Sequence, residues 1–236
     1  MNRRTLQVSA LLLTASIMGT PAYADYEYGP FARIAMLKPH DAQINDWEQG
    51  YVRHLQWHVN NHETFNWYGY NLWSSGHQRY FVYATFGHSA KSLSNPIDPA
   101  NDERDTVINI IPYVEFLDNW LLEFLPQASQ GNGVPSPLQR TEFTTVDLKP
   151  GMEKRFEAAL YASRARLHGE TQWYRLISGA AVPRYVRLRP EKSLEDFLGA
   201  RSGAALPPGT ANLIESEKVE VLNFRPTMSI NVPGPK

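Results

Sequence analysis

Histidines spaced four residues apart are the side chains in this sequence best suited to chemistry. His54, His58 and His62 follow one another at that interval. Residues four apart lie on the same side of an α-helix, so this spacing brings their imidazole rings together. Two imidazoles one helical turn apart can bind one metal ion, and a single imidazole can accept or donate a proton. The histidines therefore predict a metal site or an acid–base site on one helix.

Aromatic side chains with polar edges lie close to these histidines in the sequence. Such rings give a large contact area and few, directional hydrogen bonds, which suits a small, flat, apolar organic ligand. We predict a catalytic group made of His58, His62 and Tyr51. The predicted ligand-binding residues around it are His54, Trp47, Tyr70, Trp73 and Tyr83.

Three functions are compatible with these residues. The first is binding of a small hydrophobic or aromatic molecule without a cofactor, with proton-transfer or oxygenase-type chemistry as a further step. The second is binding of haem or a divalent metal through His54, His58 and His62. The third is a structural or partner-binding module that has no ligand.

The composition excludes several other kinds of chemistry. The chain of 236 residues has no cysteine, which excludes disulfides, thiolate nucleophiles and cysteine-bound zinc. Its formal net charge of -1 gives no indication of the excess basic charge that is typical of proteins that bind nucleic acid. An acidic segment could bind a cation, but its spacing matches no Ca²⁺ loop, and we interpret it as a solvated loop; its residues are Asp98, Asp102, Glu103 and Asp105.

The first 24 residues have the three parts of a signal peptide. Arg3 and Arg4 come first, an uncharged and mostly apolar run follows from 6 to 18, and small residues precede Asp25. That run is shorter than the span of about 20 residues that crosses a bilayer. We predict cleavage before Asp25 and a periplasmic or secreted mature protein. No later stretch of sequence predicts a membrane span.

A repeat divides the remaining chain into two halves. The order Leu-Lys-Pro, Trp-Tyr, Arg-Tyr and Lys-Ser-Leu occurs at 37–39, 67–68, 79–80 and 91–93, and again at 148–150, 173–174, 184–185 and 192–194. The second half has Ser163 and Leu167 where the first has His54 and His58. We therefore assign 25–126 to a first repeat on the ligand side, 127–137 to a linker and 138–236 to a second repeat.

The periodicity of apolar residues predicts the elements that position the histidines. In the first repeat we expect strands at 33–38, 65–73 and 80–86, a helix at 44–62, a longer helix at 106–124 and a last strand at 138–141. In the second repeat we expect strands at 143–149, 172–177, 184–188 and 218–224, with helices at 152–167 and 194–198. Each repeat thus follows the ferredoxin-like plan.

This plan resembles the dimeric α/β-barrel superfamily, which includes antibiotic-biosynthesis-monooxygenase-like, NIPSNAP-like, chlorite-dismutase-like and haem-degrading proteins. The segment 148–156, the pair Trp173-Tyr174 and the segment 193–197 carry the resemblance best. It implies an α+β fold in which two ferredoxin-like repeats form an intrachain dimeric α/β-barrel. Haem-binding members use a histidine, which agrees with the second function above. The resemblance leaves a homodimer of the tandem chain open.

Overall fold

Eight antiparallel strands close into a barrel in the computed structural model of this protein. The structure describes residues 27–74, 79–181, 183–199 and 206–233, so the predicted signal peptide lies outside the described residues. Around the barrel the strands follow the order β1-β3-β2-β8-β5-β7-β6-β4. Among the described residues, no helix is both long and apolar enough to cross a membrane.

The two halves of the chain contribute similar sets of elements. The first half contains β1 (Tyr28–Pro39), α1 (Ile44–Asn60), β2 (Tyr68–Ser74), β3 (Phe81–His88), α2 (Ala90–Ser94), α3 (Pro99–Asn109) and β4 (Val114–Phe124). The second half contains β5 (Arg140–Leu148), α4 (Glu153–Ser163), β6 (Gln172–Ser178), β7 (Arg184–Glu191), α5 (Leu194–Gly199) and β8 (Ile214–Phe224).

Two seams join the halves into one sheet. Within each half the strands have the ferredoxin-like order, β4-β1-β3-β2 and β8-β5-β7-β6. Strand β2 pairs with β8, where Tyr70 lies opposite Phe224, and β4 pairs with β6, where Phe124 lies opposite Tyr174. The predicted α+β fold, two ferredoxin-like repeats that form a dimeric α/β-barrel, is confirmed.

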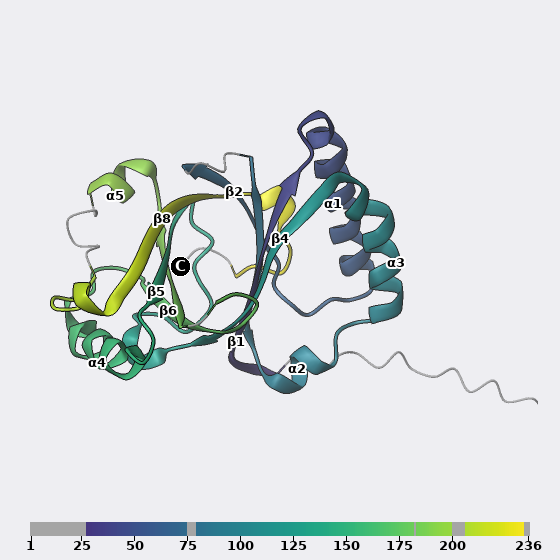
Figure 1. Ribbon diagram of the computed structural model, residues 1–236. Coiled ribbons are helices and arrows are strands. Elements are labelled where there is room, and N and C mark those ends of the chain that lie inside the picture. Colours follow the sequence, from purple (N-terminus) through teal and green to yellow (C-terminus); the bar gives the residue numbers. More distant parts are fainter. Residues whose placement is uncertain (1–26, 75–78, 182, 200–205, 234–236) are drawn as a thin grey trace, which may run out of the picture.

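Side chains fill the inside of the barrel and helices cover its outside. Alternate residues of a strand point to opposite faces, so Ile34 and Met36 of β1 face inward while Leu37 packs outward beneath α1. Aromatic residues from both halves fill the interior, including Tyr68, Phe86, Trp120, Phe143 and Tyr174. Helices α1 and α3 lie on one side of the barrel, and α4 and α5 lie on the other (Figure 1).

The predicted helix at 106–124 is wrong. Helix α3 occupies 99–109, and β4 follows at 114–124. Trp120, Leu122 and Phe124 alternate with more exposed residues and point into the barrel, because β4 pairs with both β1 and β6. The strand expected at 138–141 is also not the last strand of the first half, since β5 begins at Arg140.

Candidate functional site

A cavity of about 130 Å³ lies between helices α1 and α3 and the outer face of the first-half sheet. Four of its lining residues come from α1, and others come from α3, β1, β3, β4 and the segments next to them. The lining residues are Arg33, Leu37, Tyr51, His54, Leu55, His58, Trp67, Tyr83, Asp102, Thr106, Ile110 and Phe116. Two of the three predicted histidines thus lie beside one cavity.

Helix α1 holds His54 and His58 one turn apart, facing α3. Their Nε2 atoms are 3.2 Å apart, and their ring centroids are 4.6 Å apart with the rings nearly perpendicular. The His58 side chain is only 5% exposed and that of His54 only 13%. Residue spacing on α1 therefore creates a pair of imidazoles that is largely shielded from water.

Helix α3 supplies a carboxylate to this pair. Asp102 Oδ1 lies 3.6 Å from Nε2 of His54 and 3.6 Å from Nε2 of His58. This oxygen is buried and has no hydrogen-bond partner among the described residues. The three side chains thus form a group whose ligand atoms could all reach one metal ion.

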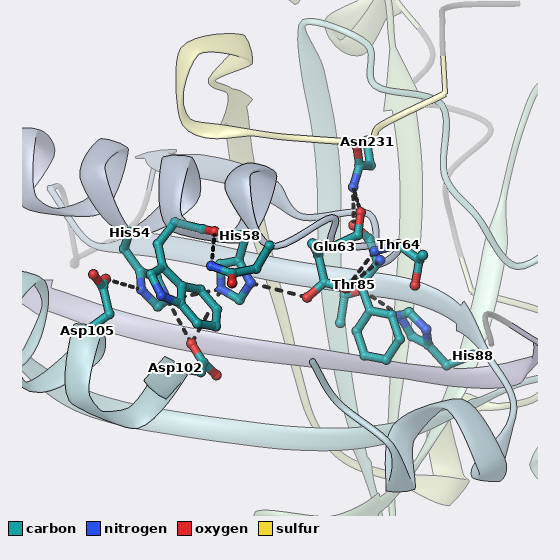
Figure 2. A network of polar contacts seen from close by, with 12 residues as sticks. His54, His58, Glu63, Thr64, Thr85, His88, Asp102, Asp105 and Asn231 are labelled. Carbon is teal, nitrogen blue, oxygen red and sulfur yellow. Dashed lines mark hydrogen bonds and ion pairs between the residues drawn. The ribbon is translucent and has the colours of Figure 1, made fainter. Parts of the chain in front are cut away.

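Further carboxylates hold the other nitrogen of each imidazole. His54 Nδ1 lies 2.8 Å from Asp105 Oδ2, and His58 Nδ1 lies 3.2 Å from Glu63 Oε2. Because an ionised carboxylate only accepts hydrogen bonds, a neutral His54 carries its proton on Nδ1 and a lone pair on Nε2. Glu63 favours the same tautomer of His58 through its charge and its closeness to Nδ1, although this contact does not have the geometry of a hydrogen bond. Figure 2 shows His54, His58 and Asp102 pointing toward one another, with Asp105 and Glu63 on the far sides of the two rings.

Hydrogen bonds fix both supporting carboxylates. Glu63 Oε1 accepts from the backbone N–H groups of Thr64 at 2.7 Å and Phe65 at 2.9 Å. Asp105 Oδ1 accepts from Asn109 Nδ2 at 3.0 Å. The orientation of each imidazole is therefore set by a carboxylate that is itself held in place.

Close packing of α1 against the end of α3 keeps the two helices in this register. A Cβ atom added at Gly50 would lie 2.1 Å from the backbone oxygen of Asn109, which is far inside contact distance. Arg53 of α1 also donates from Nε to Asn109 Oδ1 at 2.8 Å. The absence of a side chain at Gly50 therefore lets the acidic face of α3 approach the histidines of α1.

Burial shifts the protonation of His54 and Asp102 toward their neutral forms. Burial lowers the pKa of His54, and the neighbouring His58 lowers it further, while Asp105 and Asp102 act in the opposite direction. Burial raises the pKa of Asp102 against the effect of both histidines. Burial would also raise the pKa of Glu63, but the neighbouring His58 and hydrogen bonds from the backbone outweigh it and lower that pKa. A deprotonated His54 keeps its lone pair available at neutral pH.

The structure brings together His54, His58, Tyr51 and Tyr83 of the predicted site residues. Both tyrosines line the cavity, and burial raises the pKa of each phenol. Trp47 does not line the cavity; it packs beside Tyr51, with ring centroids 5.0 Å apart, in the apolar layer beneath α1. Its contribution is to hold Tyr51 rather than to touch a ligand.

Three other predicted residues lie elsewhere. Helix α1 ends at Asn60, and His62 follows it as an exposed residue with a φ of 60°, so the prediction that it shares the face of His58 is wrong. Tyr70 points into the barrel interior and stacks on Tyr68. Trp73 is 43% exposed and lies beneath the guanidinium of Arg140.

The acidic residues that complete the group were interpreted from the sequence as a solvated loop, and that interpretation is wrong. Pro99 is the first residue of α3 and follows Asp98, a start typical of helices. In such a helix Asp102 and Asp105 are three residues apart and share a face. This spacing could have predicted that their carboxylates lie together. Glu63 carried no comparable signal, because its position depends on the turn after α1.

Within the described residues of the second half, the helices that could carry such a group are shorter. Helix α4 has 11 residues, whereas α1 has 17. Ser163 is the last residue of α4, and Leu167 lies beyond it in extended conformation. Leu167, at the position corresponding to His58, therefore lies outside a helix. Between β7 and β8 the residues that the structure describes include α5, with 6 residues, where the first half has α2 and α3.

The sequence matches no protein-family model, and no curated protein resembles it at a significant level. Solved structures with the same fold do exist. A provisionally assigned monooxygenase from Fusobacterium nucleatum is 10% identical, with a TM-score of 0.62 over 84% of this chain and 93% of that one. Chlorite dismutase from Candidatus Nitrospira defluvii, solved with imidazole, is 11% identical, with a TM-score of 0.57 over 85% and 93%.

An anthrone oxidase-like protein is a third structural relative, 8% identical, with a TM-score of 0.54 over 84% of this chain and 92% of that one. At such low identity these similarities concern the fold alone. The chain has the dimeric α/β-barrel fold in tandem, along nearly the full length of each relative. The fold does not determine the chemistry, which depends on the residues of this chain.

A haem does not fit the residues present. The cavity of about 130 Å³ is smaller than the pockets of roughly 300–1,000 Å³ that hold drug-sized ligands. In addition, Nε2 of His54 and Nε2 of His58 face each other at 3.2 Å, which leaves no room for a macrocycle between either nitrogen and the opposite wall. The donor set suits a single ion instead, because imidazole and carboxylate together are typical ligands of divalent transition metals.

Proposed function

We propose that this protein binds a divalent first-row transition metal through Nε2 of His54, Nε2 of His58 and Oδ1 of Asp102. The observation that carries this proposal is the convergence of three lone-pair atoms on one point. Each imidazole is turned by a carboxylate at Nδ1 so that its Nε2 lone pair faces the other and Asp102. Three such acceptors repel one another unless a cation or a proton lies between them.

The distances agree with a coordination sphere. Ligand atoms held at about 2.0–2.1 Å from a tetrahedral zinc ion lie about 3.3 Å from one another. In this structure the Nε2 atoms of His54 and His58 are 3.2 Å apart, and each is 3.6 Å from Asp102 Oδ1. Only small side-chain movements would therefore be needed to bind the ion.

The charge of the site also favours a divalent cation. Asp102, Asp105 and Glu63 contribute three negative charges around the two imidazoles. Arg33, which lines the same cavity, contributes one positive charge. A divalent ion balances the remaining two negative charges, and carboxylates that orient metal-bound histidines are typical of such sites.

Three protein ligands leave the metal with an open side. Sites with three protein ligands and a free position are typical of catalytic metals, whereas structural zinc sites have four protein ligands. Because His54, His58 and Asp102 all line the cavity, the free position would face it. A metal held in this way can polarise a bound water molecule or an oxygen atom of a ligand.

Metal titration of purified, chelator-treated protein tests the proposal. We expect one equivalent of Zn²⁺ or Co²⁺ to bind, measured by calorimetry and elemental analysis, and Co²⁺ to give the visible absorption of a low-coordinate site. His58→Ala and Asp102→Asn should each abolish stoichiometric binding. His62→Ala is the matched control, because His62 is exposed beyond the end of α1. Unchanged binding by His58→Ala and Asp102→Asn would refute the proposal.

A metal-free function is the second candidate. Glu63 and His58 form a buried carboxylate–imidazole pair beside the cavity, an arrangement that can accept a proton from a small organic ligand. Tyr51 would serve only as a proton donor, since burial raises its pKa and keeps the phenol neutral. Turnover or ligand binding that persists after removal of metal by a chelator would favour this candidate.

We also propose that the protein acts outside the cytoplasm. The support is the sequence alone, in which Arg3 and Arg4, an apolar run and the small residues before Asp25 follow the order of a signal peptide. Because the chain has no cysteine, export to an oxidising compartment would form no disulfides in it.

A further inference from the structure

The cavity beside the three ligands has two chemically different regions. His54, His58 and Asp102 give it a polar end, Arg33 adds one cationic side chain to its wall, and the rest of the wall presents rings and aliphatic side chains. The apolar region is formed by Leu37, Leu55, Ile110 and Phe116, with the rings of Tyr51, Trp67 and Tyr83. A ligand that fills it therefore needs an apolar body and an oxygen-rich end.

One donor in this wall lacks a partner. The indole Nε1 of Trp67 is buried and has no hydrogen-bond partner among the described residues. Its ring lies 5.4 Å from that of His58 and 5.7 Å from that of Tyr83, measured between centroids. A buried N–H without an acceptor costs stability, so this position favours a ligand that brings one.

The size of the cavity limits the body of the ligand to one ring. An apolar cavity of about 150 Å³ engineered in another protein binds benzene. The cavity here is of similar size, about 130 Å³, and it is lined on several sides by aromatic rings. Rings packed against rings make favourable offset and edge-to-face contacts.

We propose that the cavity binds a monocyclic aromatic carboxylate, with its carboxylate at the open side of the metal and its ring against Tyr83 and Ile110. This inference rests on the proposed metal site. One carboxylate oxygen would bind the metal, and the second would accept from Trp67 Nε1. With a divalent ion bound, the charges of the site balance, so a monoanion is not repelled. The Arg33 guanidinium, which lines the same cavity, adds attraction for an anion.

Calorimetric titration of the zinc-loaded protein with benzoate tests this assignment. We expect saturable binding at one equivalent, about tenfold tighter than that of acetate, which lacks the ring, or benzyl alcohol, which lacks the charge. Trp67→Phe should weaken benzoate binding about threefold to tenfold through loss of one hydrogen bond, and zinc stoichiometry should stay at one. Trp73→Phe is the matched control, because Trp73 lies on β2 away from the cavity.

Arg33→Gln provides a second variant, and it too should weaken benzoate binding while zinc still binds. If zinc binds and benzoate does not, the proposed ligand, a monocyclic aromatic carboxylate, is refuted, while the proposed metal site is retained. If acetate binds as tightly as benzoate, the assignment of the ring to the apolar region is refuted. If no zinc binds, the proposed function itself fails, and elemental analysis separates that result from the others.

Discussion

Nε2 of His54 lies 3.2 Å from Nε2 of His58, while Nδ1 of each ring contacts a different carboxylate. Two neutral imidazoles held in this way point lone pairs at each other. A shared proton or a bound metal ion would relieve this repulsion, and Asp102 Oδ1, 3.6 Å from both nitrogens, adds a third ligand atom.

Metal affinity should depend on pH below the ordinary pKa range of histidine. Burial lowers the pKa of His54, so this residue is unprotonated at neutral pH and competes little with the metal. We expect zinc affinity to be nearly constant above about pH 6.5 and to fall below it, where protons begin to occupy the ligands. Calorimetry across this range measures the effect. Affinity that rises on acidification would contradict the assignment of Nε2 atoms as ligands.

Glu63→Gln should weaken zinc binding about tenfold to a hundredfold, because loss of a carboxylate that orients a metal-bound histidine has effects of this size. The Glu63 side chain is only 4% exposed and its carboxylate contacts Nδ1 of His58. Glu48→Gln is the matched control: Glu48 lies on α1 and pairs with Arg225 at 2.9 Å, outside the cavity. Equal affinities for the two variants would show that Glu63 does not orient His58.

Gly50→Ala should push α3 away from α1. The added Cβ would lie 2.1 Å from the Asn109 backbone oxygen, and we expect a loss of about 1–3 kcal/mol in unfolding free energy from overpacking. Zinc affinity should fall as well, because Asp102 moves with α3. Gly199→Ala is the control, since a Cβ there meets nothing within 4 Å. Urea denaturation and zinc titration of both variants provide the comparison.

Acid should destabilise the fold through His88. This side chain is fully buried on β3, and burial lowers its pKa to about 4, with Glu63 opposing the shift. In the unfolded chain the pKa is about 6.5, so stability is present above that pH and is lost as pH falls toward 4, by up to about 3 kcal/mol. His88→Gln should flatten the dependence of unfolding free energy on pH between 7 and 4. His168→Gln, which replaces an exposed histidine, is the control and should leave that dependence unchanged.

Expression in a Gram-negative host tests export. We expect the mature chain to begin at Asp25, as measured by the intact mass of the protein recovered from the periplasm or the medium. Ala24→Leu places a bulky residue before the cleavage site and should leave a longer, unprocessed chain. Recovery of the wild-type protein only from the cytoplasm with its N-terminus intact would overturn the prediction.

The architecture could be predicted from the sequence because the two halves repeat short motifs around the same elements. Trp67-Tyr68 and Trp173-Tyr174 mark equivalent strands, and the Lys-Pro pairs mark where β1 and β5 end or nearly end. The misassigned segment 106–124 shows the limit of this approach. Its run Trp120-Leu121-Leu122 is apolar on successive residues, and only pairing with β1 and β6 determines that it is a strand.

The candidate site could be predicted only in part. The four-residue spacing was sufficient to predict that the side chains of His54 and His58 lie together, since both residues are on one helix. Asp102 reaches them from another helix, and the approach of α3 depends on the lack of a side chain at Gly50, which periodicity does not reveal. His62 was misplaced because the helix ends two residues earlier, at Asn60, a difference that pattern alone does not resolve.

The two seams of the barrel make the folding stability of each half depend on the other half. A half expressed alone would expose the backbone donors and acceptors of β2 and β4, or of β8 and β6, as unpaired sheet edges. Such fragments would associate with each other or aggregate, and they would not exist as separate folded units. Energy released when an ion binds beside α1 is therefore shared with β5 to β8, so the half that lacks the histidines gains thermal resistance from an ion it never touches.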